Sequence, residues 1–330
     1  MSGSASIQAL SKIALLGLPG VGPARAIQVA QTFGSLAEFR ELCEERFDSD
    51  DSSVESAWQR AQRTIEHCEK LDITPVGHGD KAMYPDRLNA IKDPPPVLYV
   101  KGNSEPVHER VLVAIVGTRE PTHYGQKAAK ALGEKAAGDG IPVISGLALG
   151  CDTFGHKGCV EANGTAIAVM AHGLDHLYPK ANLGLAHLIV ETGGALVSEH
   201  PPGVKPTRWF FAKRDRLQSA LSDIVIVVET GLKGGTQHTI RAALEQRRVL
   251  ACVTPVKPLL GHEKVQGTLK LLKTGEAQPI SESGQLSELV EEFLGDSALE
   301  VASESRFTAG PKVAPQMRTE EPTIVQGKLF

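Results

Sequence analysis

The spacing of apolar residues divides the chain into a helical first part and a longer part in which strands alternate with helices. Up to residue 70, apolar side chains recur every three or four residues, as at Ile13 and Leu16 and again at Phe33 and Leu36. This spacing places them on one face of a helix, whereas a strand with one exposed face would alternate every second residue. We therefore predict helices for residues 7–70.

From Leu71 onward, short runs rich in β-branched residues alternate with segments of helix length, such as 126–140 (QKAAKALGEKAAGDG) and 239–248 (TIRAALEQRR). The predicted strands are residues 73–76, 97–100, 111–116, 142–144, 165–170, 195–197, 224–228 and 249–253. Continuous apolar strands separated by helices form a parallel sheet that is covered on both faces. The pattern therefore predicts an α/β fold.

The periodic pattern ends near residue 295. The remaining residues are mixed in charge, punctuated by prolines and without a helical or strand repeat. Such a composition does not bury enough apolar surface to fold by itself. We predict an N-terminal helical domain at residues 1–70, an α/β domain at 71–295 and a disordered tail at 296–330.

Charge and cysteine content narrow the class of protein. The 330 residues include 39 Asp+Glu against 35 Lys+Arg, a net charge of −4, which excludes a histone-like coat of positive charge. Five cysteines without a C-x-x-C pair fit a reducing cytoplasm better than a disulfide framework. No apolar run approaches the roughly 18 residues of a membrane span, and the N-terminus lacks the pattern of a signal peptide. We predict a cytoplasmic protein with no membrane partner.

Loops rich in Gly, Ser and Thr follow four of the predicted strands. These are residues 117–125 (GTREPTHYG), 145–152 (SGLALGCD), 171–179 (AHGLDHLYP) and 229–239 (ETGLKGGTQHT). In a parallel sheet, such loops meet at the carboxyl ends of the strands, where helix N-termini offer free amides that suit a phosphate. Arg119 adds a guanidinium group to this edge. The pattern predicts an anion site there.

A cluster of aromatic and basic residues precedes the strand at 224–228. The sequence WFFAKRDRL places three aromatics at 209–211 next to Lys213, Arg214 and Arg216. Aromatic faces beside cations are typical of surfaces that stack the bases of a single strand and neutralise its phosphates. The alternative is that the aromatics fill the core and the cations are solvated. Because the cluster lies just before a strand that leads into GGTQHT, we expect it to reach the same edge of the sheet.

Taken together, these segments resemble the DNA-processing protein A family (DprA, also called Smf). The matching segments are YPDRLNAIKDPPPVLYVKG (84–102), AIVGTREPTHYG (114–125), ISGLALGCDTFGHKG (144–158), GTAIAVMAHGLDHLYPKAN (164–182), LVSEHPPG (196–203), FFAKRDRLQSALS (210–222) and GGTQHT (234–239). The resemblance implies an extended Rossmann-like fold, a homodimer, and sequence-independent binding of single-stranded DNA. It also implies that the protein loads or assists the RecA recombinase in transformation and recombination.

The resemblance also implies which residues would form the DNA-binding pocket. They are Arg119, Ser145, Gly146, Phe211, Lys213, Arg214, Arg216, Gly234, Gly235 and Thr236. Three positions depart from the family pattern. Ala212 stands in place of Pro, Asp215 in place of Asn, and Leu149 in place of Arg. Asp215 replaces a polar amide, and Leu149 replaces a positively charged side chain. Affinity for DNA is therefore expected to be lower than in typical members.

Two short motifs lie outside the α/β part. LLGLPGVGPARA (15–26) is similar to a helix-hairpin-helix turn, in which Gly20, Gly22 and Arg25 would make a secondary contact with DNA, or it is simply a turn between helices. At the carboxyl end, QGKLF is similar to the pentapeptides that bind the bacterial sliding clamp. In this interpretation, Gln326, Leu329 and Phe330 would contact the clamp.

The strand-end loops lack the signatures of a cofactor or catalytic site. GTREPTHYG is not the G-x-G-x-x-G of a dinucleotide fold, and GLKGGTQHT lacks the ending of a Walker A loop. Asp152 and His156 are four residues apart, but an Asp that caps a helix above a packed His explains the pair. We predict no cofactor, no metal and no enzyme activity. Two alternatives remain: a nucleotide-binding enzyme, because GGTQHTIRAALE faintly resembles the loop of nucleotide phosphoribohydrolases, and an adaptor whose protein contacts dominate.

Overall fold

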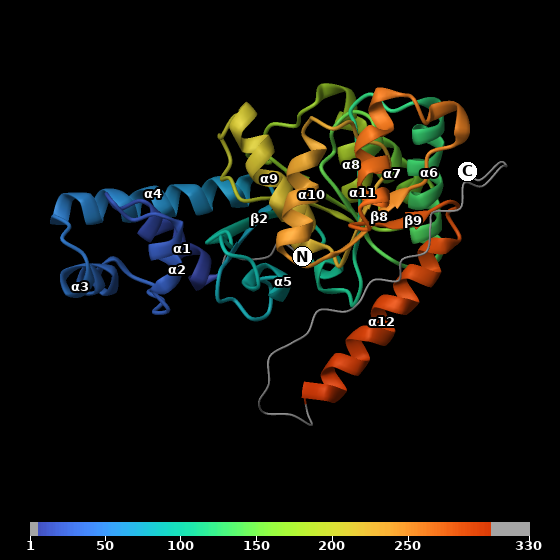
Figure 1. Ribbon diagram of the computed structural model, residues 1–330. Coiled ribbons are helices and arrows are strands. Elements are labelled where there is room, and N and C mark those ends of the chain that lie inside the picture. Colours follow the sequence, from blue (N-terminus) through green and yellow to red (C-terminus); the bar gives the residue numbers. More distant parts are fainter. Residues whose placement is uncertain (1–5, 305–330) are drawn as a thin grey trace.

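The computed structural model describes the backbone of residues 6–304 and the side chains of residues 6–295. Four helices come first, and Figure 1 shows them at one end of the sheet. They are α1 (Ile7–Leu16), α2 (Pro23–Gln28), α3 (Leu36–Arg46) and α4 (Asp51–Lys70). Phe33 and Phe39 stack with ring centroids 4.6 Å apart, and Trp58 of α4 packs against both rings. The predicted helical periodicity therefore produces a small core of its own.

A nine-stranded sheet forms the centre of the described chain, in the order β1-β2-β6-β5-β4-β3-β7-β8-β9. Its strands are β1 (Ile73–Gly77), β2 (Val97–Gly102), β3 (Val113–Val116), β4 (Val143–Ser145), β5 (Ala166–Met170), β6 (Ala195–Ser198), β7 (Ile224–Val227), β8 (Val249–Val253) and β9 (Gln278–Ile280). All eight predicted strands are present. The ninth, β9, was missed because two of its three residues are exposed and it has no apolar run.

The sheet is mostly parallel, and its first two strands are the exception. β1 pairs antiparallel with β2, and β2 pairs antiparallel with β6, whereas every neighbouring pair from β6 to β9 is parallel. The segment between β1 and β2 contains only α5 (Asp86–Asn89), and a parallel connection normally needs a helix long enough to cross the sheet. The prediction of a parallel sheet thus holds for six of the eight predicted strands, β3 to β8, and is wrong for β1 and β2.

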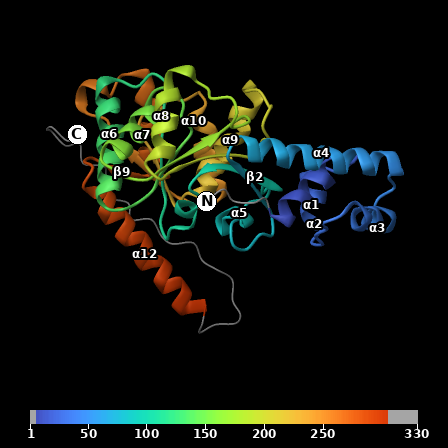
Figure 2. The same ribbon diagram turned by 180° about the vertical axis from the view of Figure 1, so that it is seen from behind.

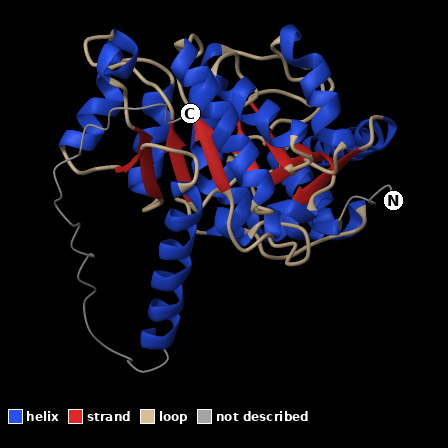
Figure 3. Ribbon diagram, turned by 90° about the vertical axis from the view of Figure 1, so that its right-hand side faces the viewer, coloured by secondary structure: helices blue, strands red, loops and turns tan. Residues whose placement is uncertain are grey.

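Helices cover both faces of the sheet (Figure 3). One face packs against α6 (His123–Gly138), α7 (Cys151–Glu161), α8 (Leu183–Glu191) and α12 (Gln285–Glu304). The other face packs against α5, α9 (Arg208–Leu221), α10 (Thr236–Glu245) and α11 (Gln266–Lys273). Within β3, Val113 and Ile115 enter the first core while Ala114 and Val116 enter the second. Both faces of a strand are therefore apolar, which explains why the strands read as continuous apolar runs.

Helix α12 continues past residue 295, where the tail was expected to begin. Leu286, Leu289 and Val290 are buried in the core against one face of the sheet, and the helix that carries them continues to Glu304. Figure 2 shows α12 extending away from the sheet. The helix therefore extends through residues 296–304, past the position at which the tail was expected to begin. The rest of the predicted tail, including Gln326, Leu329 and Phe330, lies outside the described residues.

None of the helices in residues 6–304 is long and apolar enough to cross a membrane.

The order of the strands fixes where a ligand site can lie. β4 and β5 follow on one side of β3, whereas β7 lies on the other side. The connections out of β3 and β7 therefore leave a crevice at their carboxyl ends, which is the usual place for a ligand in an open α/β sheet. The loops that begin at residues 117 and 229 meet at this point.

Candidate nucleic-acid interface

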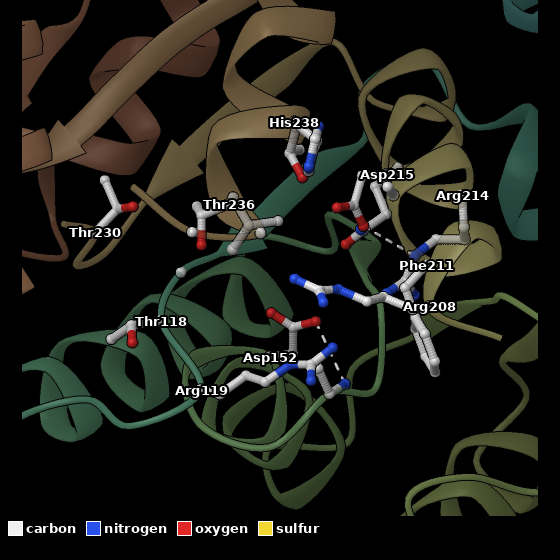
Figure 4. Close-up of a pocket in the computed structure, with 18 of the residues that line it drawn as sticks. Thr118, Arg119, Asp152, Arg208, Phe211, Arg214, Asp215, Thr230, Thr236 and His238 are labelled. Carbon is white, nitrogen blue, oxygen red and sulfur yellow. Dashed lines mark hydrogen bonds and ion pairs between the residues drawn. The ribbon is translucent and has the colours of Figure 1, made fainter. Parts of the chain in front are cut away.

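A pocket of about 890 Å³ opens at this crevice (Figure 4). Its walls come from the loops after β3, β4 and β7, from one side of α9 and from the first turn of α10. The lining includes Thr118, Arg119, Asp152, Tyr178, Arg208, Phe211, Arg214, Asp215, Gln218, Lys233, Gly234, Gly235, Thr236 and His238. Three of the four predicted strand-end loops thus contribute main-chain or side-chain atoms, and the fourth contributes Tyr178.

The backbone around Arg119 is held by close packing between two loops. Thr118 donates its N–H to Glu229 O at 2.8 Å, and its carbonyl accepts from Cys151 N at 3.1 Å. Gly150 has φ +85°, and a Cβ placed there would lie 2.3 Å from Thr118 O. Only glycine fits such an approach. Gly150 at the start of α7 therefore allows the close contact that holds the backbone of Thr118 and Arg119 in place.

Glu229 is buried just after β7, and its carboxylate lies at the start of α6, beside Thr122 and Gly125. Its carboxylate accepts from Thr122 N at 2.8 Å and from Thr122 Oγ1 at 2.5 Å, while Thr122 Oγ1 accepts from Gly125 N. The start of α6 is thus already occupied by a carboxylate and is not an anion site. By contrast, α10 starts after Gly235 with no side-chain cap, next to the pocket. Among the described helices at this edge, α10 best matches the predicted site, in which amides at a helix N-terminus bind a phosphate.

Helix α9 places its predicted residues on two different faces. Arg208, Phe211 and Asp215 line the pocket at helical spacing. Lys213 and Arg216 are absent from its lining. Both bind the buried carboxylate of Glu199, Lys213 Nζ at 3.2 Å and Arg216 Nη2 at 2.9 Å from Oε2, and Arg216 Nε also lies 2.5 Å from Asp93 Oδ2. These two cations are therefore neutralised outside the pocket.

Arg214 lines the pocket, but its guanidinium is buried and hydrogen-bonded to neighbouring residues of the protein. The residue is 3% exposed and donates to Gly146 O at 2.8 Å, to Val169 O and to Asp215 Oδ1 at 3.1 Å. Gly146 lacks a side chain because a Cβ would lie 2.2 Å from Arg214 Nη1. Ser145 is fully buried and donates to Ile115 O at 2.7 Å. The structure thus gives Ser145, Gly146 and Arg214 a supporting role in the wall.

Three cations on the pocket lining form no ion pair with any described residue: Arg119, Arg208 and Lys233. All three are exposed. Arg208 and Lys233 were not predicted as site residues. A helical projection of α9 would have shown that Arg208 shares a face with Phe211, and Lys233 lies inside the predicted loop GLKGGTQHT. We call Arg119, Arg208 and Lys233 the rim cations.

Aromatic side chains flank one side of this rim. The Phe211 ring lies 5.5 Å from the guanidinium carbon of Arg119 and 5.7 Å from the ring of Tyr178. Trp209 is 73% exposed and lies outside the pocket, and Phe210 packs against the ring of His200 at 4.2 Å. The three consecutive aromatics therefore have three different environments, and only Phe211 lies where a ligand in the pocket would meet it.

The inner wall of the pocket is acidic. Asp152 accepts from Gly146 N at 3.1 Å and from Ala148 N at 3.3 Å, so it fixes the loop before α7 and does not cap the helix. Burial raises the pKa of Asp152 to about 6, opposed by the nearby Arg214. His156 lies one turn further along α7 and is fully buried, and burial lowers the pKa of its imidazole to about 3. No group of three or more metal-ligating side chains occurs in the part of the chain that the structure describes.

The helix-hairpin-helix segment lies in the α1–α2 turn, within the N-terminal helices. Gly20 has φ +71° and Gly22 precedes α2, with open space around both. Arg25 places its guanidinium 4.6 Å from the Phe47 ring. The buried Lys12 donates to Ala26 O at 3.0 Å and so ties α1 to the end of α2. Of the two glycines, only Gly20 has a positive φ, whereas Gly22 has φ −90°, and contact of this turn with DNA stays a prediction.

Comparison with known proteins agrees with this architecture. A family model described as DNA recombination-mediator protein A matches residues 76–291. The chain belongs to this family. The DNA processing protein DprA of Bacillus subtilis is 36% identical over 224 residues, which cover 68% of this chain and 74% of that protein. The Smf protein of Escherichia coli is 39% identical over 197 residues, and the chain spans about half (51%) of its length.

Two solved structures of the family share the fold. The DprA structure of Streptococcus pneumoniae has a TM-score of 0.67 at 24% identity and covers 87% of this chain and 99% of its own. The Helicobacter pylori structure has a TM-score of 0.60 at 28% identity and covers 67% of this chain and 96% of its own. The Helicobacter pylori protein is described as having a unique single-stranded DNA binding mode. Membership of this family implies a role in DNA processing.

Proposed function

We propose that the pocket binds single-stranded DNA without strict sequence preference. The observation that carries the proposal is the set of three unpaired rim cations around a crevice at the ends of parallel strands. Guanidinium and ammonium groups beside the start of α10 suit the phosphodiester backbone, and Phe211 offers a face on which a base can stack. The single-stranded DNA binding described for the Helicobacter pylori relative supports the same ligand class.

The proposed DNA contacts differ in role from those that the sequence suggested. Arg119, Arg208 and Lys233 would neutralise phosphates, with Gly234, Gly235 and Thr236 lending backbone amides. Phe211 would stack a base. Lys213 and Arg216 would act only indirectly, by holding α9 to Glu199. The Ala212 and Asp215 departures lie on the pocket lining, whereas Leu149 does not.

The experiment that tests this function compares single-stranded and duplex oligonucleotides over a range of salt. Three rim cations predict a slope of log K against log salt of about −2 for a single strand, because each neutralised phosphate contributes roughly −0.7. We expect duplex DNA to bind at least about tenfold more weakly, since a paired strand cannot place a base against Phe211. Fluorescence anisotropy measures both quantities. Equal binding of duplex and single strand, or a slope near zero, would contradict the proposal.

We further propose that the chain acts as a cytoplasmic homodimer that loads or assists the RecA recombinase and carries out no catalysis. This rests on membership of the family and on the family properties that the sequence resemblance implied. The terminal QGKLF would tether the protein to the sliding clamp. A titration of the clamp with the full chain and with a chain lacking Gln326–Phe330 tests this last contact, and equal affinities would exclude it.

The alternative, a phosphoribohydrolase-like enzyme, keeps the same pocket but gives it a free nucleotide as substrate. The carboxylates of Asp152 and Asp215 on the lining favour it, since hydrolysis of an N-glycosidic bond uses acidic side chains. Release of free base from nucleoside monophosphates, followed by chromatography, distinguishes the two functions.

A further inference from the structure

Three buried side chains in the inner wall of the pocket present oxygen acceptors, with the guanidinium of Arg214 beside them. Asp152, Asp215 and Gln218 line the pocket from α7 and α9, and all three are buried. Figure 4 shows the side chains of Asp152 and Asp215 on either side of the space that Arg208 enters. We call Asp152, Asp215 and Gln218 the acceptor wall.

Each residue of the acceptor wall has one oxygen without a partner among the described residues. Asp152 uses only Oδ2, for the amides of Gly146 and Ala148. Asp215 uses only Oδ1, for Arg214 Nε at 3.1 Å and Gln218 Nε2 at 2.9 Å. Gln218 is 2% exposed, and its Oε1 is buried with no hydrogen-bond partner. A buried carbonyl oxygen without a donor is costly, so a bound group that donates would be stabilised here.

A phosphate does not fit the acceptor wall, because carboxylates and a carbonyl repel its oxygens. Asp152 is largely ionised above its raised pKa of about 6; burial also raises the pKa of Asp215, and the Arg214 guanidinium beside it opposes that rise. The two carboxylates outnumber this one buried guanidinium. The free oxygens of the acceptor wall suit a ligand group with N–H donors, whereas the rim cations suit a phosphate. A nucleotide provides both, and a pocket of about 890 Å³ lies in the range that holds a molecule of that size.

We propose that the pocket takes one whole nucleotide, with its phosphate at the rim cations and an amino-bearing base, in preference to thymine, against the acceptor wall. This inference rests on the proposed function and adds a base preference to it. Cytosine, adenine and guanine each carry an exocyclic amino group that donates to Asp215 or Gln218. Thymine has a single N–H between two carbonyl oxygens, and those oxygens face the carboxylates unfavourably. The phosphate contacts therefore tolerate any sequence, and the base contact adds a preference for cytosine, adenine and guanine over thymine.

The test compares hexamers of 5-methyl-deoxycytidine and of thymidine at pH 8. These two bases share the 5-methyl group and the ring size, and they differ in the groups at positions 3 and 4. We expect the 5-methyl-deoxycytidine hexamer to bind about tenfold more tightly, the effect of one good base contact. Equal affinities of the two hexamers for the unmodified chain would overturn the inference. If the thymidine hexamer still bound with the expected salt slope, the proposed function would survive that result.

Variants assign the preference to the acceptor wall. Asp215→Asn keeps an oxygen for Arg214 and Gln218 but turns the free oxygen into a donor, so the preference should fall to about twofold or less. Gln218→Met removes the unpartnered oxygen with little change in shape and should reduce the preference as well. Lys233→Ala is the rim control and should weaken both hexamers by the same factor. A preference that stayed at about tenfold in both Asp215→Asn and Gln218→Met would overturn the assignment.

Competition by 5-methyl-dCMP and dTMP identifies the source of the nucleotide. If the monophosphates displace the hexamers with the same bias, the pocket takes free nucleotides as well as strands, and base recognition at the acceptor wall is supported. If only the hexamers compete and their bias is present, the nucleotide belongs to a strand.

Discussion

Replacing Arg119 with alanine is expected to weaken binding of a single-stranded oligonucleotide by about 10- to 100-fold. The guanidinium is exposed at the rim, forms no ion pair with a described residue and lies 5.5 Å from the Phe211 ring. A charge-assisted hydrogen bond to phosphate contributes about 1.5–3 kcal/mol, which corresponds to that loss of affinity. The loss should be the same for all sequences, and the salt slope should decrease in magnitude by about 0.7.

The matched control is Lys213→Ala. The sequence grouped Lys213 with Arg119, but the structure pairs its ammonium with Glu199 at 3.2 Å outside the pocket. We expect this variant to bind within about threefold of the unmodified chain, because a partly exposed ion pair contributes at most about 1 kcal/mol to stability. Anisotropy titrations at two salt concentrations measure both variants. If Lys213→Ala lost as much affinity as Arg119→Ala, DNA would have to bind the face of α9 that carries Lys213, outside the pocket.

Replacing Gly150 with alanine should destabilise the fold and disrupt the site at the same time. A Cβ at this position would lie 2.3 Å from Thr118 O and 2.5 Å from the carbonyl carbon of Arg119, and the backbone has φ +85° and ψ −132°. Both neighbours are backbone atoms, which do not rotate away. We expect a loss of about 3 kcal/mol or more in the free energy of unfolding, measured by urea denaturation. The folded fraction should also bind DNA more weakly, because the loop that carries Arg119 is displaced.

Gly140→Ala separates backbone strain from the clash. Gly140 also has a positive φ of +70°, but a Cβ there meets no atom within 4 Å. Its replacement should cost about 1 kcal/mol, the strain of the left-handed region alone, and leave DNA binding unchanged. Similar losses of stability in the two variants would show that the contact between Gly150 and the Thr118 backbone is not tight.

Helix α9 shows why the site could be predicted only in part. The composition of WFFAKRDRL indicated a basic surface, and the helical spacing groups Arg208, Phe211 and Asp215 on one side. Nothing local distinguishes that side from the one with Lys213 and Arg216, since both carry cations. The choice depends on Glu199 and Asp93, which are 17 and 123 residues away from Arg216. Burial of Arg214 also depends on a residue distant in the chain: Gly146 has no side chain, which leaves room for the guanidinium.

The sequence by itself determined eight of the nine strands, the parallel part of the sheet, the loops at its carboxyl edge and the presence of Arg119 among them. These features depend on hydrophobic runs and on glycine-rich turns, which act over a few residues. Only the tertiary structure decided which cations remain unpaired, which helix N-terminus without a side-chain cap lies at the pocket, and that carboxylates line the inner wall. Those outcomes depend on charges and backbone groups that are distant in the chain and meet only when the sheet assembles, so no local pattern contains them.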